Sequence, residues 1–184
     1  PVLDSLLRLD RYIATRYLAD TLTLEGDSQV IVLRGRAFIQ REGTQLEADS
    51  VRYRESACRL DAMGEPKLFD KTSVLVAESM RYDTCRRRGI VNAALTDFEQ
   101  EGTDWFMRGD LAVDSGSTRL YGAGSDVTSC ELPEPHYHFN AGKVKWLNRN
   151  VMVARPAVLY VRDVPGLWMP FIFQDIRSGR RSGM

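Results

Sequence analysis

The stretch EADSVRY occupies residues 47–53, and a near copy, VAESMRY, occupies residues 76–82. Their alanines, Ala48 and Ala77, are separated by 77 − 48 = 29 residues. The same step backwards reaches Ala19, which begins the related stretch ADTLTL. All three copies share one pattern: a small residue, an acidic residue, a small hydroxyl residue, and two apolar residues separated by a variable one.

A second marker keeps the same period. Gly35 and Gly64 are 29 residues apart, and Gly122 lies three such steps beyond Gly35. The position midway between Gly64 and Gly122 is occupied by Ala93, another small residue. Periods of about 20 to 50 residues are typical of stacked supersecondary units. The sequence therefore predicts a repeat architecture.

The repeated unit has the pattern of β-strands. In each copy the apolar residues are two apart, as in Val51 and Tyr53, which is the period of a strand with one buried face. The stretches that follow, 29–40, 58–69 and 88–95, are rich in apolar residues around a central small one. Glycine inside a strand marks a bulge or bend. We predict an all-β fold, a twisted two-sheet β-jellyroll of ~29-residue repeats that is open at both ends.

The apolar residues of the predicted inward face form a core or line an apolar groove between the sheets. A groove that admits acyl chains gains about 0.8 kcal/mol for each buried methylene. The candidate groove residues are Leu22, Leu24, Ile31, Leu33, Ile39, Val51, Tyr53, Leu60, Leu68, Met80, Tyr82 and Val91.

Composition excludes several classes of protein. Of the 184 residues, 43% are hydrophobic and 27% are charged, which is typical of a folded domain. The 25 acidic and 25 basic residues balance, which argues against a nucleic-acid partner. We expect one β domain over residues 15–163. Residues 1–14 are predicted to form an N-terminal arm or a short helix.

No pattern of catalytic residues stands out. The sequence contains no nucleophile elbow, P-loop or dinucleotide-binding fingerprint, so we expect neither an enzyme nor a cofactor. His136 and His138 are two residues apart and would point to the same side of a strand, where both could bind one metal ion. A metal-dependent jelly-roll enzyme is therefore an alternative, but we favour structural histidines. The periodic acidic residues Asp20, Asp49 and Glu78 are expected to be structural. Cys58, Cys85 and Cys130 are either inert thiols or one internal pair and an odd thiol.

The end of the chain carries a resemblance. The stretch LYVRDVPGLWMPFIFQDIRSGRRSG, residues 159–183, is similar to the segment of the OstA family of LPS-assembly proteins that leads from a periplasmic domain into an outer-membrane barrel. Gly166 departs from the aliphatic residue that usually follows the Val-Pro pair. We expect residues 164–184 to be this barrel-entry segment. The matching residues are Val164, Pro165, Pro170, Phe171, Asp175, Arg177, Arg180, Arg181, Ser182 and Gly183.

The resemblance implies a function and partners. It implies a lipid-conduit domain at the periplasmic face of a Gram-negative outer membrane, which holds the acyl chains of lipopolysaccharide and delivers them to the barrel. The implied partners are lipopolysaccharide, an LptA-like periplasmic bridge jellyroll at the N-terminal edge strand, the protein's own C-terminal barrel and its LptE-like lipoprotein plug. The main alternative is a free-standing bridge protein of the same superfamily; a carbohydrate-binding sandwich is another.

The resemblance also assigns the cysteines. Cys130 matches a cysteine that the family bonds to its barrel. Cys58 and Cys85 fall in turns of adjacent repeats, and we expect them to pair with each other.

Overall fold

The computed structural model describes residues 15–41, 43–70, 73–100, 103–114, 119–147 and 151–175. The predicted arm at 1–14 and the barrel-entry residues Arg177, Arg180, Arg181, Ser182 and Gly183 lie outside these ranges. The described strands are β1 (Thr15–Leu18), β2 (Thr21–Glu25), β3 (Val30–Arg41), β4 (Thr44–Arg54), β5 (Arg59–Met63), β6 (Lys67–Asp70), β7 (Ser73–Val76), β8 (Ser79–Asp83), β9 (Arg88–Gln100), β10 (Thr103–Asp114), β11 (Arg119–Thr128), β12 (Tyr137–Leu147), β13 (Val151–Val161), β14 (Val164–Met169) and β15 (Ile172–Asp175).

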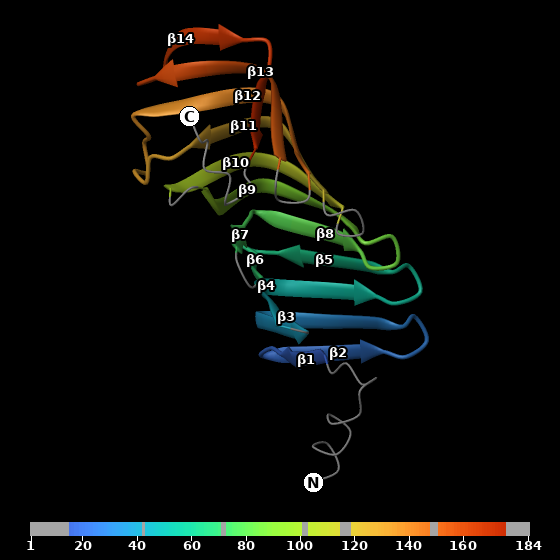
Figure 1. The fold of residues 1–184 in the computed structure, drawn as a ribbon. Helices are drawn as coiled ribbons and strands as arrows, with labels where there is room; N and C mark the ends of the chain where they lie inside the picture. Colours follow the sequence, from blue (N-terminus) through green and yellow to red (C-terminus); the bar gives the residue numbers. More distant parts are fainter. Residues whose placement is uncertain are drawn as a thin grey trace.

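All fifteen strands belong to one antiparallel sheet. Its main order is β1-β3-β4-β5-β8-β9-β10-β11-β12-β13-β14, and β2, β6, β7 and β15 pair beside this path. Strands that are close in sequence are neighbours in space, so the sheet climbs steadily from β1 to β14 (Figure 1). The all-β prediction is confirmed.

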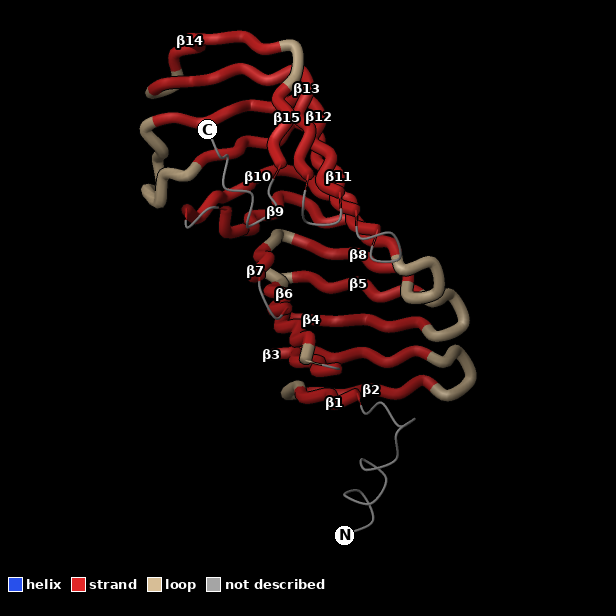
Figure 2. Tube along the Cα trace, in the orientation of Figure 1, coloured by secondary structure: helices blue, strands red, loops and turns tan. Residues whose placement is uncertain are grey.

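The long strands bend and form two arms. The first half of β3 pairs with β2 and its second half pairs with β1. At the other end, β13 pairs with β15 before its bend and with β14 after it. We call the half of the sheet that contains β2, β5, β8 and β15 the β2 arm. The half that contains β1, β6, β7 and β14 is the β1 arm. Long strands such as β3 and β13 contribute one half to each arm. Figure 2 shows the two arms meeting along a common edge.

The three predicted bend positions are confirmed. Gly35, Gly64 and Ala93 have φ angles of +72°, +78° and +48°, in the left-handed region that most side chains avoid. At Gly122, the next marker of the repeat, φ is not positive, and a positive φ (+57°) lies at Gly124 instead. Gly122 is needed for another reason, since a Cβ there would overlap the Ser125 hydroxyl.

The periodic acidic residues lie at the bends. The backbone N–H of Asp20 donates to the carbonyl of Gly35 at 2.8 Å, and that of Asp49 donates to the carbonyl of Gly64 at 3.1 Å. The N–H of Glu78 donates in the same way to Asn92 at 3.1 Å. Each copy of the repeated stretch therefore supplies one side of a bend, and the next small residue supplies the other. The backbone of each acidic position thus takes part in a bend.

The core fills the angle between the arms. One cluster of buried residues includes Leu33 and Val51 from the β2 arm together with Leu46 and Met107 from the β1 arm. Each of these side chains is at most 8% exposed. The inward faces of the two arms thus pack against each other near the bends.

Candidate functional site

Cross-strand pairing aligns the inward side chains of the β2 arm in continuous rows. The row nearest the bends, the inner row, contains only apolar residues and glycine. Its members, each paired with the next, are Leu22, Leu33, Val51, Ala62, Met80, Val91, Leu111, Gly122, Val144, Ala154 and Ile172. Its central members are sealed from solvent, since Leu33, Val51 and Leu111 are only 1–2% exposed.

A second row lies one step farther from the bends, and we call it the outer row. It is also apolar throughout. Its members are Leu24, Ile31, Tyr53, Leu60, Tyr82, Gly89, Val113, Leu120, Trp146 and Met152. In contrast to the inner row, Ile31 to Trp146 are half-buried. Ile31, Leu60, Val113, Leu120 and Trp146 pack against the buried core but keep part of their surface exposed.

The β1 arm presents a matching apolar row opposite, which we call the facing row. Thr96 is its one polar member, and its hydroxyl donates to the carbonyl of Val74 at 3.1 Å. A buried hydroxyl with a partner carries little cost. The facing row contains Tyr17, Ile39, Leu46, Leu68, Leu75, Thr96, Met107, Val127, Phe139, Leu159 and Leu167.

Small residues allow the two arms to meet. Next to the bends, the β1 arm carries Ala37, Ala48, Ala94, Ala141 and Ala157 at inward positions, each at most 8% exposed. Alanine at these positions leaves room for the larger inner-row side chains of the β2 arm. Side chains near the bends are therefore more deeply buried than those of the outer row.

The sequence-predicted groove residues are divided among these rows. Leu22, Leu33, Val51, Met80 and Val91 lie in the inner row. Leu24, Ile31, Tyr53, Leu60 and Tyr82 lie in the outer row, and Ile39 and Leu68 lie in the facing row.

Leu22 and Leu24 differ from the rest because β2 is the last strand of its arm among the described residues. They are 46% and 66% exposed, whereas their paired neighbour Leu33 is 1% exposed. The two inward rows therefore end in exposed leucines at this edge of the sheet.

Sequence reasoning missed the second half of the rows, which includes Val113, Leu120, Trp146, Met107 and Phe139. The spacing of the repeat loosens beyond residue 100, so the period gave no guidance there. The available signal was the alternation of apolar and polar residues, for example in LAVD at 111–114.

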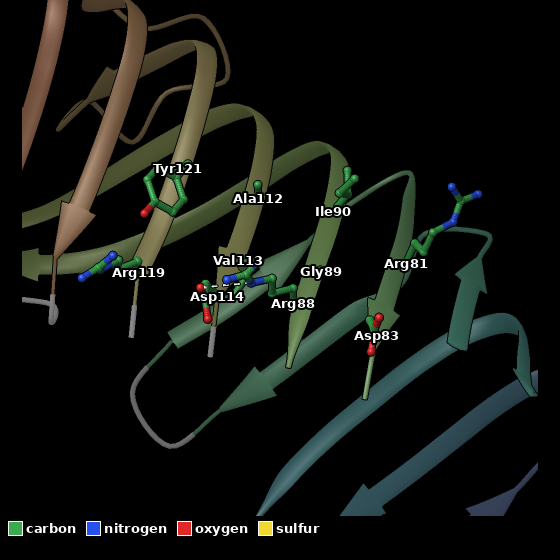
Figure 3. A pocket seen from close by; sticks show the side chains of 10 residues that line it. All are labelled: Arg81, Asp83, Arg88, Gly89, Ile90, Ala112, Val113, Asp114, Arg119 and Tyr121. Carbon is green, nitrogen blue, oxygen red and sulfur yellow. Dashed lines mark hydrogen bonds and ion pairs between the residues drawn. The ribbon is translucent and has the colours of Figure 1, made fainter. Parts of the chain in front are cut away.

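The outward face of the β2 arm is charged. It contains a hollow of about 560 Å³ that spans β8 to β11 (Figure 3). Arg88 pairs with Asp114 at 3.3 Å beside an apolar floor that includes Ile90 and Ala112. The backbone N–H and the guanidinium of Arg86 lower the pKa of the nearby Asp83 carboxyl. The charged side chains of this hollow alternate with the inward positions, although Gly89 and Val113 of the outer row also line it.

Cys58 and Cys85 form a disulfide with a Cα–Cα distance of 5.6 Å, as expected from the sequence. Cys130 is a free thiol, and its Sγ lies 3.6 Å from Nδ1 of His136. His138 stacks on the ring of Tyr160, with centroids 5.0 Å apart. The described part of the chain brings together no group of three or more potential metal ligands.

The predicted barrel-entry residues that the structure describes continue the sheet. Val164 and Pro165 lie in β14, where they pair with Val161 and Tyr160 of β13. Pro170 and Phe171 connect β14 to β15, which pairs with the other half of β13. No described helix is long and apolar enough to cross a membrane.

Known proteins resemble this chain in sequence and in fold. No protein-family model matches the chain. The LPS-assembly protein LptD of Bordetella pertussis is 25% identical over 172 residues, which cover 90% of this chain and 21% of the relative. The chain is similar to LptD. The LptD proteins of Bordetella avium and Azoarcus sp. (strain BH72) are each 24% identical, over 173 and 179 residues. The chain spans about a fifth of the length of these LptD relatives.

A solved structure shares the fold. LptH from Pseudomonas aeruginosa, described as the LptA-homologous periplasmic component of the lipopolysaccharide transport device, superposes with a TM-score of 0.51 at 18% identity. The match covers 60% of this chain and 82% of LptH. The jellyroll predicted from the repeat is therefore the fold of a known structure, and the similarity to LptD extends over nearly the whole chain.

Proposed function

We propose that this chain is a lipid-conduit domain of an LptD-type lipopolysaccharide translocon, at the periplasmic face of a Gram-negative outer membrane. The observation that carries the proposal is the outer row, which is apolar without interruption from Leu24 to Met152 and only partly buried along most of its length. A row that served only as core would be sealed like the inner row.

The geometry suits transport along the row. Neighbouring strands are ~4.8 Å apart, so a row that crosses the sheet from β2 to β13 extends for roughly 40 Å. Each methylene of an acyl chain gains about 0.8 kcal/mol on burial against such a surface. Because successive strands present similar apolar side chains, a lipid that moves by one strand makes similar apolar contacts before and after the step. Affinity and mobility are thus compatible, and no chemical step is needed.

The rows assign roles to the predicted groove residues. Inner-row residues such as Leu33, Val51 and Met80 form the floor, and outer-row residues such as Tyr53 and Tyr82 contact the acyl chains. The facing row covers the opposite side. The sugars of lipopolysaccharide remain in water beyond the outer row.

Both ends of the rows fit a longer path. At β2, the exposed Leu22 and Leu24 give another jellyroll, an LptA-like periplasmic bridge, a surface on which to continue the sheet and the rows. At β14 and β15, the path continues toward a C-terminal barrel with its LptE-like lipoprotein plug. Cys130, the free thiol, is proposed to bond to that barrel. The similarity to LptD over 90% of the chain supports this assignment over a free-standing bridge protein.

A binding measurement tests the proposal. Leu60→Glu places a carboxylate in the outer row, and we expect it to weaken lipopolysaccharide binding by at least about tenfold, because the charge is desolvated by a bound acyl chain. Ile90→Glu is the matched control, because Ile90 is 53% exposed and points outward. Lipopolysaccharide with its acyl chains removed should bind neither the parent nor the variants. Equal binding by both variants, with an unchanged fold by circular dichroism, would show that the outer row does not hold lipid.

A further inference from the structure

A row of charged residues borders the outer row at the strand ends of the β2 arm, and we call it the rim row. Each member is the sequence neighbour of an outer-row residue, on the side away from the bends. Its members, each paired with the next, are Arg54, Arg59, Asp83, Arg88, Asp114 and Arg119. The charged stretch ends at β4 and β11, because the adjoining positions are Val30 and Leu147. With four arginines and two aspartates, the rim row is positive in a chain whose 25 acidic and 25 basic residues balance.

Both aspartates of the rim row already have arginine partners. Asp83 pairs with Arg86 of the adjoining turn at 3.0 Å, and Asp114 pairs with Arg88 at 3.3 Å. Arg119 is the last charged member, and Figure 3 shows its guanidinium pointing away from Asp114. Among the residues that the structure describes, no carboxylate forms an ion pair with Arg119. Its donors are therefore free to bind an anion.

The hollow of about 560 Å³ connects these cations to the apolar outer row. Its lining includes Arg88 and Arg119 of the rim row as well as Gly89 and Val113 of the outer row (Figure 3). Gly89 contributes no side chain, and the ring of its cross-strand partner Tyr82 lies so close that a Cβ at Gly89 would be 2.9 Å from Cδ2. One ligand at this edge of the sheet can therefore contact the arginines and the apolar row together.

We propose that Arg88 and Arg119 bind a phosphate group on the sugars of a lipopolysaccharide molecule whose acyl chains lie on the outer row. This inference rests on the proposed conduit function and adds a headgroup contact to it. Guanidinium groups bind phosphate through paired, charge-assisted hydrogen bonds. The apolar outer row and the positive rim row together match an amphiphile with an anionic headgroup. Arg81 and Tyr121 lie one row closer to the bends and take no part in the contact.

The phosphate contact is weak by itself. Both arginines are exposed, Arg88 with 68% of its side chain in solvent, so water and salt reduce the attraction. We expect about millimolar affinity for one phosphate group, and lipopolysaccharide without acyl chains therefore stays unbound at micromolar concentrations. In the intact lipid, the bound acyl chains hold the phosphate at the rim row. The same contact then raises the affinity by about tenfold.

Binding of lipopolysaccharide, and of the same lipid after chemical removal of its phosphates, tests the proposal. We expect the parent to bind the phosphorylated form about tenfold more tightly. Arg119→Gln should remove most of this preference and leave the affinity for the dephosphorylated form unchanged, which also shows that the variant is folded. Arg119→Lys should keep part of the preference, because it retains the charge without the paired donors. Arg34→Gln is the matched control, since Arg34 is exposed on the same face but adjoins Leu33 of the inner row.

The outcomes separate the phosphate contact from the conduit. Equal affinity of the parent for the two lipids overturns the contact and leaves the conduit in place. A phosphate preference that survives Arg88→Gln combined with Arg119→Gln, or that Arg34→Gln removes equally, also overturns the contact. If the parent binds neither lipid, both the conduit and the contact are wrong. Added salt should weaken binding of the phosphorylated lipid more than binding of the dephosphorylated lipid, and equal weakening would contradict the proposal.

Discussion

The backbone N–H of Asp49 donates to the carbonyl oxygen of Gly64 at 3.1 Å, and the Asp49 carboxylate occupies the space that a Cβ on Gly64 would need. The same relationship joins Asp20 and Gly35, at 2.8 Å. These contacts explain why the acidic residue and the glycine recur with the same period. One residue packs against the other across neighbouring strands at each bend.

Gly64→Ala is expected to destabilise the domain by about 1–3 kcal/mol, because alanine is strained at a φ of +78° and its methyl group overlaps Asp49. Urea unfolding measures the change. Combining it with Asp49→Gly removes the overlapping side chain, its Cβ included, but keeps the backbone strain, so the double variant should lose less than the sum of the single variants. Gly26→Ala, where a Cβ meets nothing within 4 Å, is the control and should be nearly neutral.

The disulfide between Cys58 and Cys85 joins neighbouring turns that are 27 residues apart in sequence. Loop-closure entropy for a loop of this length gives about 3–4 kcal/mol of stability. Replacing both cysteines by serine should therefore lower the free energy of unfolding by up to that amount. Reduction of the unmodified protein should have a similar effect. A thiol assay of the oxidised, unfolded chain should find one free thiol, from Cys130; three free thiols would refute the pairing.

Asp61 gives the outward face a dependence on pH. Burial raises the pKa of its carboxyl, but hydrogen bonds from Arg59 at 2.8 Å and Arg81 at 3.0 Å outweigh this, and the net pKa lies below the ordinary value of 3.8. A carboxyl whose pKa is lowered by folding stabilises the folded state when it is ionised. Its contribution is complete well above pH 3.8 and is lost as the pH falls through the folded-state pKa.

Asp61→Asn should therefore reduce stability by about 1 kcal/mol at neutral pH, because the pairs with Arg59 and Arg81 are partly exposed. The difference from the parent should shrink as the pH falls below 3.8. Urea unfolding at several pH values measures both effects. A constant difference at all pH values would mean that Asp61 acts through packing alone. Asp27→Asn, in an exposed turn, is the control.

The first half of the fold could be predicted from the sequence because its repeat is nearly exact. Ala48 and Ala77 mark the same bend in successive repeats, and the small residue at Gly35, Gly64 and Ala93 takes the positive φ in each. Glycine adopts that backbone conformation most readily, which makes Gly35 and Gly64 local signals, while Ala93 follows from the period alone. The period and the period-two alternation were therefore sufficient to place the strands and their bends.

The second half depends on contacts that local sequence does not encode. Gly122 keeps the spacing of the repeat, yet the positive φ lies at Gly124. The division of the candidate groove residues into a sealed inner row and an open outer row could not be predicted either. It depends on how far the arms diverge, which is a property of the whole sheet.

The central claim is that acyl chains lie along the outer row, and site-specific photo-crosslinking to lipopolysaccharide tests it most directly. Photoreactive residues at Tyr53, Tyr82 and Leu120 point inward, and each has an outward sequence neighbour as a matched control: Arg52, Arg81 and Tyr121. The account predicts strong adducts at the three inward positions and weak ones at the neighbours. Equal labelling of inward and outward positions would contradict it.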